Sequence, residues 1–217
     1  MKSTIIELLK AKKQVILILI LIIFYTVGTI GILSPNYSNY FLSLSFFNLL
    51  LSFIVILIAT TKLSRNFLLF VLLCFVVGIV VELIGTKTGL LFGDYAYGKN
   101  LGIKISGVPI VIGINWAILI ISSASITNRL HVSLLLKIIL SAIFMTFLDV
   151  LMEPVAIESD FWNWKNGIIP FYNYVCWFII SLLLNYLYFK FKLVKTNKVY
   201  DALFIIMLVF FSLLNIF

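Results

Sequence analysis

Long apolar runs separated by short polar breaks recur along the whole chain. A hydrocarbon layer of roughly 30 Å takes about 20 helical residues to cross, and seven runs have close to that length. In lipid a continuous apolar run satisfies its backbone hydrogen bonds only as a helix, whereas barrel strands alternate apolar and polar positions. We therefore predict an all-α fold, a polytopic integral membrane bundle of about seven transmembrane helices. The predicted spans are residues 15–33, 40–59, 67–84, 108–125, 132–151, 171–189 and 202–217.

Composition agrees with a single membrane-embedded domain. Of the 217 residues, 63% are hydrophobic and 11% are charged, which excludes an ordinary water-soluble domain. The first apolar run is longer than the core of a secretory signal and is not followed by a small-residue cleavage site, so we interpret it as a span. No linker, low-complexity tract or internal repeat divides the sequence, and we expect one transmembrane helical domain over residues 1–217.

Lysine and arginine are distributed unequally between the two sets of loops. Eleven lie in the N-terminal arm and in the loops on its side, and four lie in the loops on the opposite side. Because basic loops stay in the cytoplasm, we predict a multi-pass protein of the cell membrane with a cytoplasmic N-terminus. The net charge of +8 then reflects topology and contact with anionic lipid rather than nucleic-acid binding.

The residues that the chain lacks narrow its chemistry. His131 is the one histidine, which excludes the imidazole clusters that hold iron in membrane desaturases and hydroxylases, and we expect neither a metal nor another cofactor. Cys74 and Cys176 lie in predicted spans and do not indicate a disulfide framework. The sequence has no glycine-rich phosphate loop, and its last predicted span has no lysine for a retinal Schiff base.

Acidic residues and tryptophans gather at one end of the predicted bundle. Loops three and five fall on the same side of the membrane, together with the span ends that border them. All four tryptophans belong to that side. So do six of the eight acidic residues, namely Glu82, Asp94, Asp149, Glu153, Glu158 and Asp160. The candidate site is therefore placed at that rim.

Asp149 and Glu153 are four residues apart, so a helix stacks them on one face, and Pro154 is expected to limit the helix just beyond them. Two carboxylates this close do not both ionise readily, so one is expected to keep its proton and serve as an acid. Glu82, at the end of another span, is a candidate third member. The alternative is that these acids only end helices in water, and this reading is preferred for Glu158 and Asp160.

Aromatic and amide side chains lie beside these acids. Tryptophan and tyrosine anchor helices at membrane interfaces whatever a protein does, but an aromatic face also stabilises a nearby cation by about 0.5–2 kcal/mol. An acid within an aromatic cage is typical of a carbocation site. Asn115 and Asn173 are expected either to orient a water or carboxylate or to join two helices, and Asn48 to join helices.

The third loop is rich in glycine, with six glycines between Gly85 and Gly107. We interpret it as a folded, tyrosine-bearing cap over a membrane-facing pocket, with an ordinary flexible loop as the alternative.

A set of short motifs covers about residues 75–180. They are Glu82-x-x-Gly85-x-x-x-Gly89, Gly93-Asp94-Tyr95-x-Tyr97, Gly107-Val108-Pro109 followed by Trp116, Asp149-x-x-x-Glu153-Pro154, Trp162-x-Trp164 and Pro170-x-x-Asn173-x-x-x-Trp177. Their order resembles the integral-membrane carotenoid hydratases of the CruF, or bisanhydrobacterioruberin hydratase, type. The chain departs from that pattern at Glu153, where aspartate is common, at Cys176, where glycine is common, and in a shorter segment between Trp164 and Pro170.

The resemblance implies cofactor-independent addition of water across the terminal double bond of an acyclic carotenoid, which gives a tertiary alcohol. On this hypothesis Asp149 donates the proton and Glu153 or Glu82 acts as the base. The expected substrate-binding residues are Asp94, Tyr95, Tyr97, Asn115, Trp116, Trp162, Trp164, Asn173 and Trp177.

The implied partners are the carotenoid, water and membrane lipid, with association with other carotenoid enzymes left open. A carotenoid cyclase that uses the same cation and a proton-coupled transporter are the alternative functions.

Overall fold

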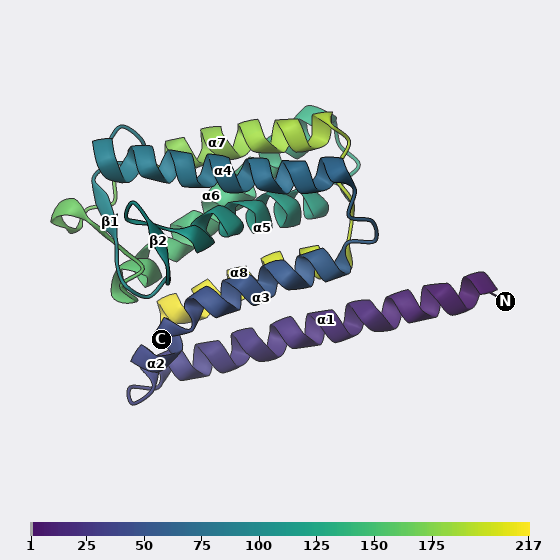
Figure 1. The fold of residues 1–217 in the computed structure, drawn as a ribbon, viewed down its shortest axis with the longest axis horizontal. Helices are drawn as coiled ribbons and strands as arrows, with labels where there is room; N and C mark the ends of the chain where they lie inside the picture. The colour runs from purple at the N-terminus through teal and green to yellow at the C-terminus, as the bar shows by residue number, and fades with distance from the viewer. Residues whose placement is uncertain (1) are drawn as a thin grey trace.

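The computed structural model describes residues 2–217, with side chains from Leu9 onward. This part of the chain forms a helical bundle with a few short strands at one end (Figure 1). The helices are α1 (Lys2–Leu33), α2 (Ser38–Ser43), α3 (Ser45–Ala59), α4 (Arg65–Thr88), α5 (Ile110–Thr127), α6 (Leu134–Glu158), α7 (Phe171–Lys190) and α8 (Lys198–Ile216). Within the described residues, six helices are long and apolar enough to cross a membrane. The predicted all-α polytopic fold is confirmed.

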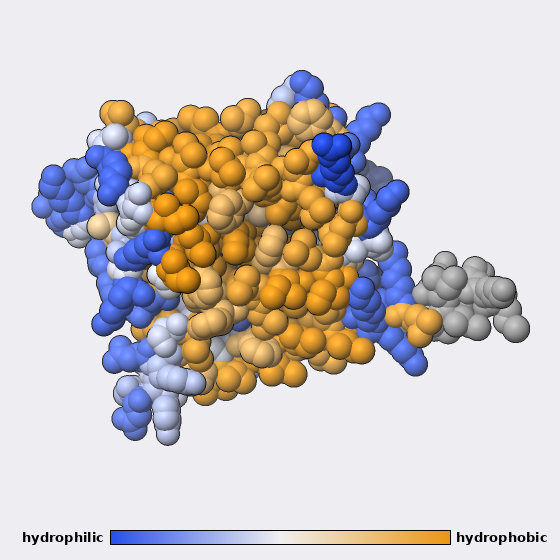
Figure 2. All heavy atoms as spheres, in the orientation of Figure 1, coloured by the Kyte–Doolittle hydropathy of each residue, from blue (hydrophilic) through white to orange (hydrophobic). Residues whose placement is uncertain are grey.

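The surface agrees with a membrane-spanning bundle. On the face shown in Figure 2, apolar residues form a broad belt across the middle of the molecule, and hydrophilic residues collect at its two ends. The belt includes exposed side chains of α1, α4 and α7, among them Ile23, Leu69 and Leu183. Exposed apolar side chains at this density are unfavourable in water and favourable against lipid tails. The protein is therefore an integral membrane protein.

The second predicted span, residues 40–59, differs from the prediction because it is broken at Leu44 into α2 and α3. The hydroxyl of Ser43 donates to the carbonyl of Tyr40 at 2.7 Å, a local bond that competes with regular helix hydrogen bonding. The remaining helix α3 has 15 residues, about 22 Å at 1.5 Å per residue. Six long helices and one shorter apolar helix thus replace the seven predicted spans.

Helix α5 lies at the centre of the bundle and packs against α3, α4, α6, α7 and α8. Small residues along it let neighbouring backbones approach closely. A Cβ atom on Gly113 would lie 2.7 Å from the backbone oxygen of Phe75 in α4, so this contact requires glycine. The hydroxyls of Ser122 and Ser123 donate hydrogen bonds to carbonyl oxygens of their own helix, which allows both side chains to be buried.

Two pairs of short strands close one end of the bundle, at the left of Figure 1. Strand β1 (Tyr95–Tyr97), from the loop after α4, pairs antiparallel with β4 (Trp162–Trp164), from the loop after α6. Strands β2 (Lys104–Ile105) and β3 (Val108–Pro109) form a small hairpin, and a short 3-10 turn, η1 (Lys165–Gly167), follows β4. The two loops predicted to share a side of the membrane are therefore hydrogen-bonded to each other.

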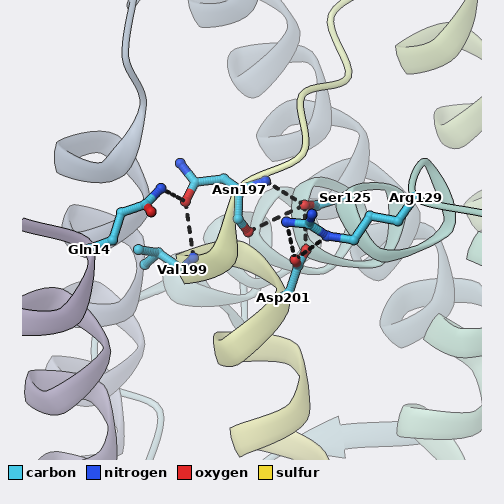
Figure 3. Close-up of polar contacts among 6 residues, drawn as sticks. All are labelled: Gln14, Ser125, Arg129, Asn197, Val199 and Asp201. Atoms are coloured by element: carbon cyan, nitrogen blue, oxygen red, sulfur yellow. Dashed lines mark hydrogen bonds and ion pairs between the residues drawn. The ribbon is translucent and has the colours of Figure 1, made fainter. Parts of the chain in front are cut away.

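Asn197 joins several helices at the opposite end of the bundle (Figure 3). Its side-chain oxygen accepts from the backbone N–H of Val199 at 3.0 Å, which caps the start of α8, and from Gln14 of α1 at 3.2 Å. Its side-chain nitrogen donates to the carbonyl of Ala59, the last residue of α3, at 2.9 Å. One buried amide thus connects α1 and α3 to the start of α8.

Asp201 makes the second connection at that end (Figure 3). Its carboxylate accepts from the hydroxyl of Ser125 in α5 at 2.5 Å and pairs with Arg129 at 2.6 Å. The Ser125 hydroxyl oxygen also accepts from the backbone N–H of Asn197. Helix α8 is therefore fixed to the central helix α5 by side-chain hydrogen bonds as well as by packing.

Candidate active site

Three buried carboxylates, Glu82 of α4 and Asp149 and Glu153 of α6, line one cavity of about 370 Å³. Asp149 and Glu153 lie on the same face of α6, as the four-residue spacing predicted. The expectation that Pro154 limits the helix is wrong, because α6 continues to Glu158 with Pro154 inside it. A proline inside a helix removes one backbone hydrogen bond and crowds the carbonyl four residues earlier, but its φ is helical, and here the helix continues past it.

Glu82 accepts three hydrogen bonds. The hydroxyls of Tyr95 and Tyr97 donate to its Oε2 atom, the second at 2.7 Å, and the indole N–H of Trp116 donates to Oε1 at 3.3 Å. Burial, and next the charge of Glu82, raise the pKa of both tyrosines above the ordinary value, so their hydroxyls stay protonated and remain donors.

Two glycines on α4 make room for these donors around Glu82. A Cβ atom on Gly78 would lie 2.6 Å from the ring of Trp116, and one on Gly85 would lie 2.9 Å from the hydroxyl of Tyr95. Gly78, Glu82 and Gly85 recur at helical spacing, so they share one face of α4. Larger residues at the two glycines would push the indole and the phenol away from the carboxylate.

The β1–β4 ribbon presents four aromatic side chains to the cavity. Tyr95 is paired with Trp164 and Tyr97 with Trp162, and all four line the cavity. Successive residues of a strand point to opposite faces, so positions two apart share a face. The ring centroids of Tyr95 and Trp164 are 5.0 Å apart. The glycine-rich loop is folded as the predicted tyrosine-bearing cap.

Glu153 also accepts three hydrogen bonds, all from N–H groups. The indoles of Trp162 and Trp164 donate to Oε2 at 3.0 and 2.7 Å, and the amide of Asn173 donates to Oε1 at 3.0 Å. Donor-only partners on both oxygens match an ionised carboxylate. The two tryptophans therefore position Glu153 in addition to forming the cavity wall.

Asp149 is held differently from Glu153. Its Oδ2 atom accepts from the same amide nitrogen of Asn173, at 2.9 Å. Its Oδ1 atom is buried and has no hydrogen-bond partner among residues 9–217. The residue itself is 0% exposed. A buried oxygen without a partner is costly and rare, so Oδ1 is the atom of this cluster most ready for an additional partner.

Asn115, Trp116 and Trp177 complete the inner wall. The rings of Trp116 and Trp177 stack with centroids 4.2 Å apart. Asn115 lines the cavity, and its buried Oδ1 atom has no partner within the described side chains. Trp116 itself is fully buried behind the cavity surface and reaches the site through Glu82.

Asp94 does not join the site. Its side chain is 57% exposed and pairs with Lys165 at 3.1 Å, and it is not among the lining residues. Strand alternation explains this position, because Tyr95 points inward and Asp94 and Ala96 on either side of it point outward. The expectation that Asp94 contacts substrate is therefore not matched by its place in the fold. Glu158 is exposed, as predicted.

Several lining residues come from segments that the sequence indicated only as membrane spans. They are Phe24, Tyr25, Val27, Gly28 and Ile32 of α1, Phe41, Leu44, Ser45, Phe47, Asn48 and Leu49 near the start of α3, and Met207, Phe210 and Phe211 of α8. Apolar side chains in a span carry no signal that separates a cavity wall from a lipid-facing surface. Asn48 was expected to join helices, but its Oδ1 atom is buried without a partner in the described part of the chain.

Clusters of carboxylates can also serve as metal ligands. No group of three or more His, Cys, Asp or Glu side chains within the described residues is arranged to hold a metal ion. The carboxylates instead accept hydrogen bonds from tyrosine, tryptophan and asparagine. The arrangement provides one freely available carboxyl oxygen, two hydrogen-bonded carboxylates and an aromatic wall, which together suit proton transfer to an apolar ligand.

Fold and cavity define an integral membrane protein with buried carboxylates in an apolar, aromatic pocket. A family model described as "Carotenoid biosynthesis protein" matches residues 43–217, and the chain belongs to that family. Its role therefore lies in carotenoid biosynthesis. The matched region is wider than the 75–180 segment on which the resemblance was based, and it includes α3 and α8. Comparisons with curated proteins and with solved structures found no match.

Proposed function

We propose that the protein hydrates the terminal double bond of an acyclic carotenoid and so forms a tertiary alcohol. Membership of the carotenoid biosynthesis family supports the substrate class, and buried carboxylates in an apolar cavity support acid catalysis on an alkene. The observation that carries the proposal is Oδ1 of Asp149, a buried carboxyl oxygen without a hydrogen-bond partner in a residue that lines the cavity.

The different hydrogen bonding of the two acids of α6 supports different roles for them in the proposal. Glu153 accepts three N–H donors, which favour its ionised form, whereas Asp149 accepts one. In the proposal a proton shared by the two acids therefore resides on Oδ1 of Asp149, an atom that has no hydrogen-bond partner among residues 9–217. Asp149 is the general acid of the proposal, and Glu153 is the base.

The proposed reaction balances without a cofactor. Asp149 gives its proton to the less substituted carbon of the double bond, the π electrons form the new C–H bond, and a tertiary cation remains. The oxygen of a water molecule bonds to that carbon, and Glu153 takes the surplus proton, so the sum is alkene plus water to alcohol. Proton return from Glu153 to Asp149 through water resets the site.

The aromatic residues stabilise the cation in this scheme. The faces of Tyr95, Tyr97, Trp162 and Trp164 border the cavity beside the acids, and such a face stabilises a cation by about 0.5–2 kcal/mol. Asn115, whose side-chain oxygen is unpartnered in the described structure, is the residue proposed to orient the water.

A cyclase is the second candidate, because it would use the same acid and cation and then lose a proton. The amide oxygen of Asn115, which has no partner among the described side chains, favours water capture, since it offers a polar position in a wall that is otherwise mostly apolar. A proton-coupled transporter would place acids in helices broken near mid-bilayer, whereas here they lie near one end of unbroken helices under the β1–β4 cap.

Expression in a lycopene-producing bacterium tests the proposal. We expect a product that is heavier than lycopene by one water per reacting end, identified by mass spectrometry. An isomer of unchanged mass would establish a cyclase instead, added oxygen without hydrogen would contradict both reactions, and unchanged lycopene would leave transport as the better reading.

A further inference from the structure

We infer that the cavity opens sideways into the lipid between α1 and α3, and that a long acyclic chain lies through this opening while its end reaches the acids. The inference rests on the proposed function for the identity of the reacting end. The part of the cavity between α1, α3 and α8 is called the lateral arm. Its walls include Phe24, Gly28, Phe47 and Phe210.

Exposure of the lining residues locates the opening. Phe24 and Val27 of α1 and Phe47 of α3 line the cavity, yet they are 52%, 49% and 61% exposed. A residue that borders a cavity and the outer surface at the same time lies at the mouth of that cavity. Phe24 and Val27 lie within the candidate membrane span of α1, and Phe47 lies in the apolar helix α3, so we place the mouth toward lipid rather than water.

The position of the helices shows that the cavity crosses the bundle. In Figure 1, α4, which carries Glu82, lies on the far side of the bundle from α1, with α3 and α8 between them. The same cavity is lined by Glu82 and Glu153 at one side and by Phe24 at the other. It therefore extends from the acids to the flank formed by α1.

Cavity size indicates how a ligand occupies it. A volume of about 370 Å³ is at the lower end of the range of roughly 300–1,000 Å³ for small-molecule pockets. A carotenoid has about the length of the bilayer core, roughly 30 Å, and does not fit inside as a whole. One end group is enclosed, and the remaining chain leaves through the lateral arm into the hydrocarbon layer. The two ends of one molecule therefore react in separate binding events.

Replacing Gly28 with a larger residue is a way to block the lateral arm experimentally. Gly28 lies on α1 in the cavity wall, and the nearest atom to a Cβ built there is a ring carbon of Phe210 at 3.9 Å, an ordinary van der Waals contact, so a side chain can begin there without a clash. Gly31, one turn further on, is different, because a Cβ there would overlap the ring of Phe41. Gly28→Phe is thus expected to fill the lateral arm without disturbing the packing of α1 on α2.

The first experiment compares two substrates with Gly28→Phe. We expect conversion of a long acyclic carotenoid to fall roughly tenfold or more, while a short acyclic alkene with the same end group, which needs no lateral arm, is converted as before. Ile23→Phe is the matched control, since Ile23 lies on α1, faces lipid and is not part of the cavity. An equal loss of conversion for both substrates, or no loss for either, would contradict the proposed role of the lateral arm.

The second experiment needs no turnover and therefore separates this inference from the proposed function. Acyclic isoprenoids carrying a photo-reactive diazirine at the end or at mid-chain are crosslinked to the wild-type protein in lipid nanodiscs, and labelled peptides are mapped. The end probe is expected on the β1–β4 ribbon and the mid-chain probe around Phe24 and Phe47. Mid-chain labelling at other positions would contradict the inference even if hydration is confirmed. The same holds if a photo-reactive phospholipid labels these positions equally and excess isoprenoid does not displace it.

Discussion

Asn173 donates from one amide nitrogen to both acids of α6, at 2.9 Å to Asp149 and 3.0 Å to Glu153. A single N–H₂ group between two carboxyl groups holds their oxygens at fixed positions and supplies one hydrogen to each. The asymmetry of the site then comes from the other donors, since the indoles of Trp162 and Trp164 reach Glu153 alone. In the proposed scheme, residues outside α6 thus decide which of its two acids keeps a proton.

This difference predicts the effect of Asp149→Asn. The amide has nearly the same shape as the carboxyl group but has no proton acidic enough to protonate an alkene, so we expect product formation to fall about a hundredfold to ten-thousandfold. Product per amount of folded protein is measured by chromatography. Glu158→Gln is the control, because Glu158 is exposed and lies outside the cavity. Normal turnover in Asp149→Asn would show that another group donates the proton.

At the scale of elements, α4 positions the donors to Glu82 by leaving space. A methyl group on Gly78 would meet the Trp116 ring at 2.6 Å, whereas one on Gly28 of α1 has no neighbour nearer than 3.9 Å. Both substitutions to alanine gain the same helix propensity, so their difference isolates the steric effect. We expect Gly78→Ala to be less stable than Gly28→Ala by about 1–3 kcal/mol, measured by denaturant unfolding in detergent. Equal stabilities would mean that Trp116 moves freely and is not held against Glu82.

Helix α8 depends on Asn197 at its start. Asn197→Ala removes the cap on Val199 and leaves the carbonyl of Ala59 without its donor. We expect a loss of about 2–4 kcal/mol, roughly 1 from the cap and 1–3 from the unsatisfied carbonyl. Asn197→Ser keeps an oxygen that can cap the start of α8 and removes the amide that reaches Ala59, so its loss is expected to be smaller. The same loss in both variants would assign the whole effect to the bond with Ala59.

Helical elements were more predictable from sequence than the cap above the site. The spacing of Asp149 and Glu153 determined their common face, because the helical period is the same for any sequence. The break at Leu44 coincides with a local serine hydrogen bond, which hydropathy does not register. The β1–β4 pairing escaped prediction because each strand has three residues, too few for an alternating pattern to stand out.

Roles within the site were predictable only in part. The acids and aromatics stood out because polar and amphipathic residues are rare in this chain. The outward direction of Asp94 depends on strand pairing, and the lateral arm depends on which apolar faces the helices leave uncovered. Both features are consequences of tertiary packing. In the sequence, a single apolar residue such as Phe47 gives no sign of whether it will line a cavity.

At the scale of the whole molecule, the bundle has two different ends. One carries the β1–β4 ribbon and the acids, and the other carries the Asn197 and Asp201 network together with the N-terminus of α1 (Figure 1). Twelve lysine and arginine residues, including Lys137 with its hydrogen bonds to Asn128, belong to the end without the acids, and four belong to the end with them. Cytoplasmic loops are enriched in these residues, so the acid end is predicted to face away from the cytoplasm.

Cysteine labelling in intact cells tests this orientation. Cys74 and Cys176 are buried, so an added exposed cysteine is the one that reacts with a membrane-impermeant maleimide. Lys99→Cys, near the ribbon, is expected to label in intact cells, and Lys195→Cys, in the loop before α8, only after the membrane is opened. The reverse result would place the acids on the cytoplasmic side. The three lysines of the loop between α4 and α5 would then have a stronger effect on membrane orientation than the basic residues at the other end. Labelling of both positions from one side would contradict the alternating arrangement of the helices.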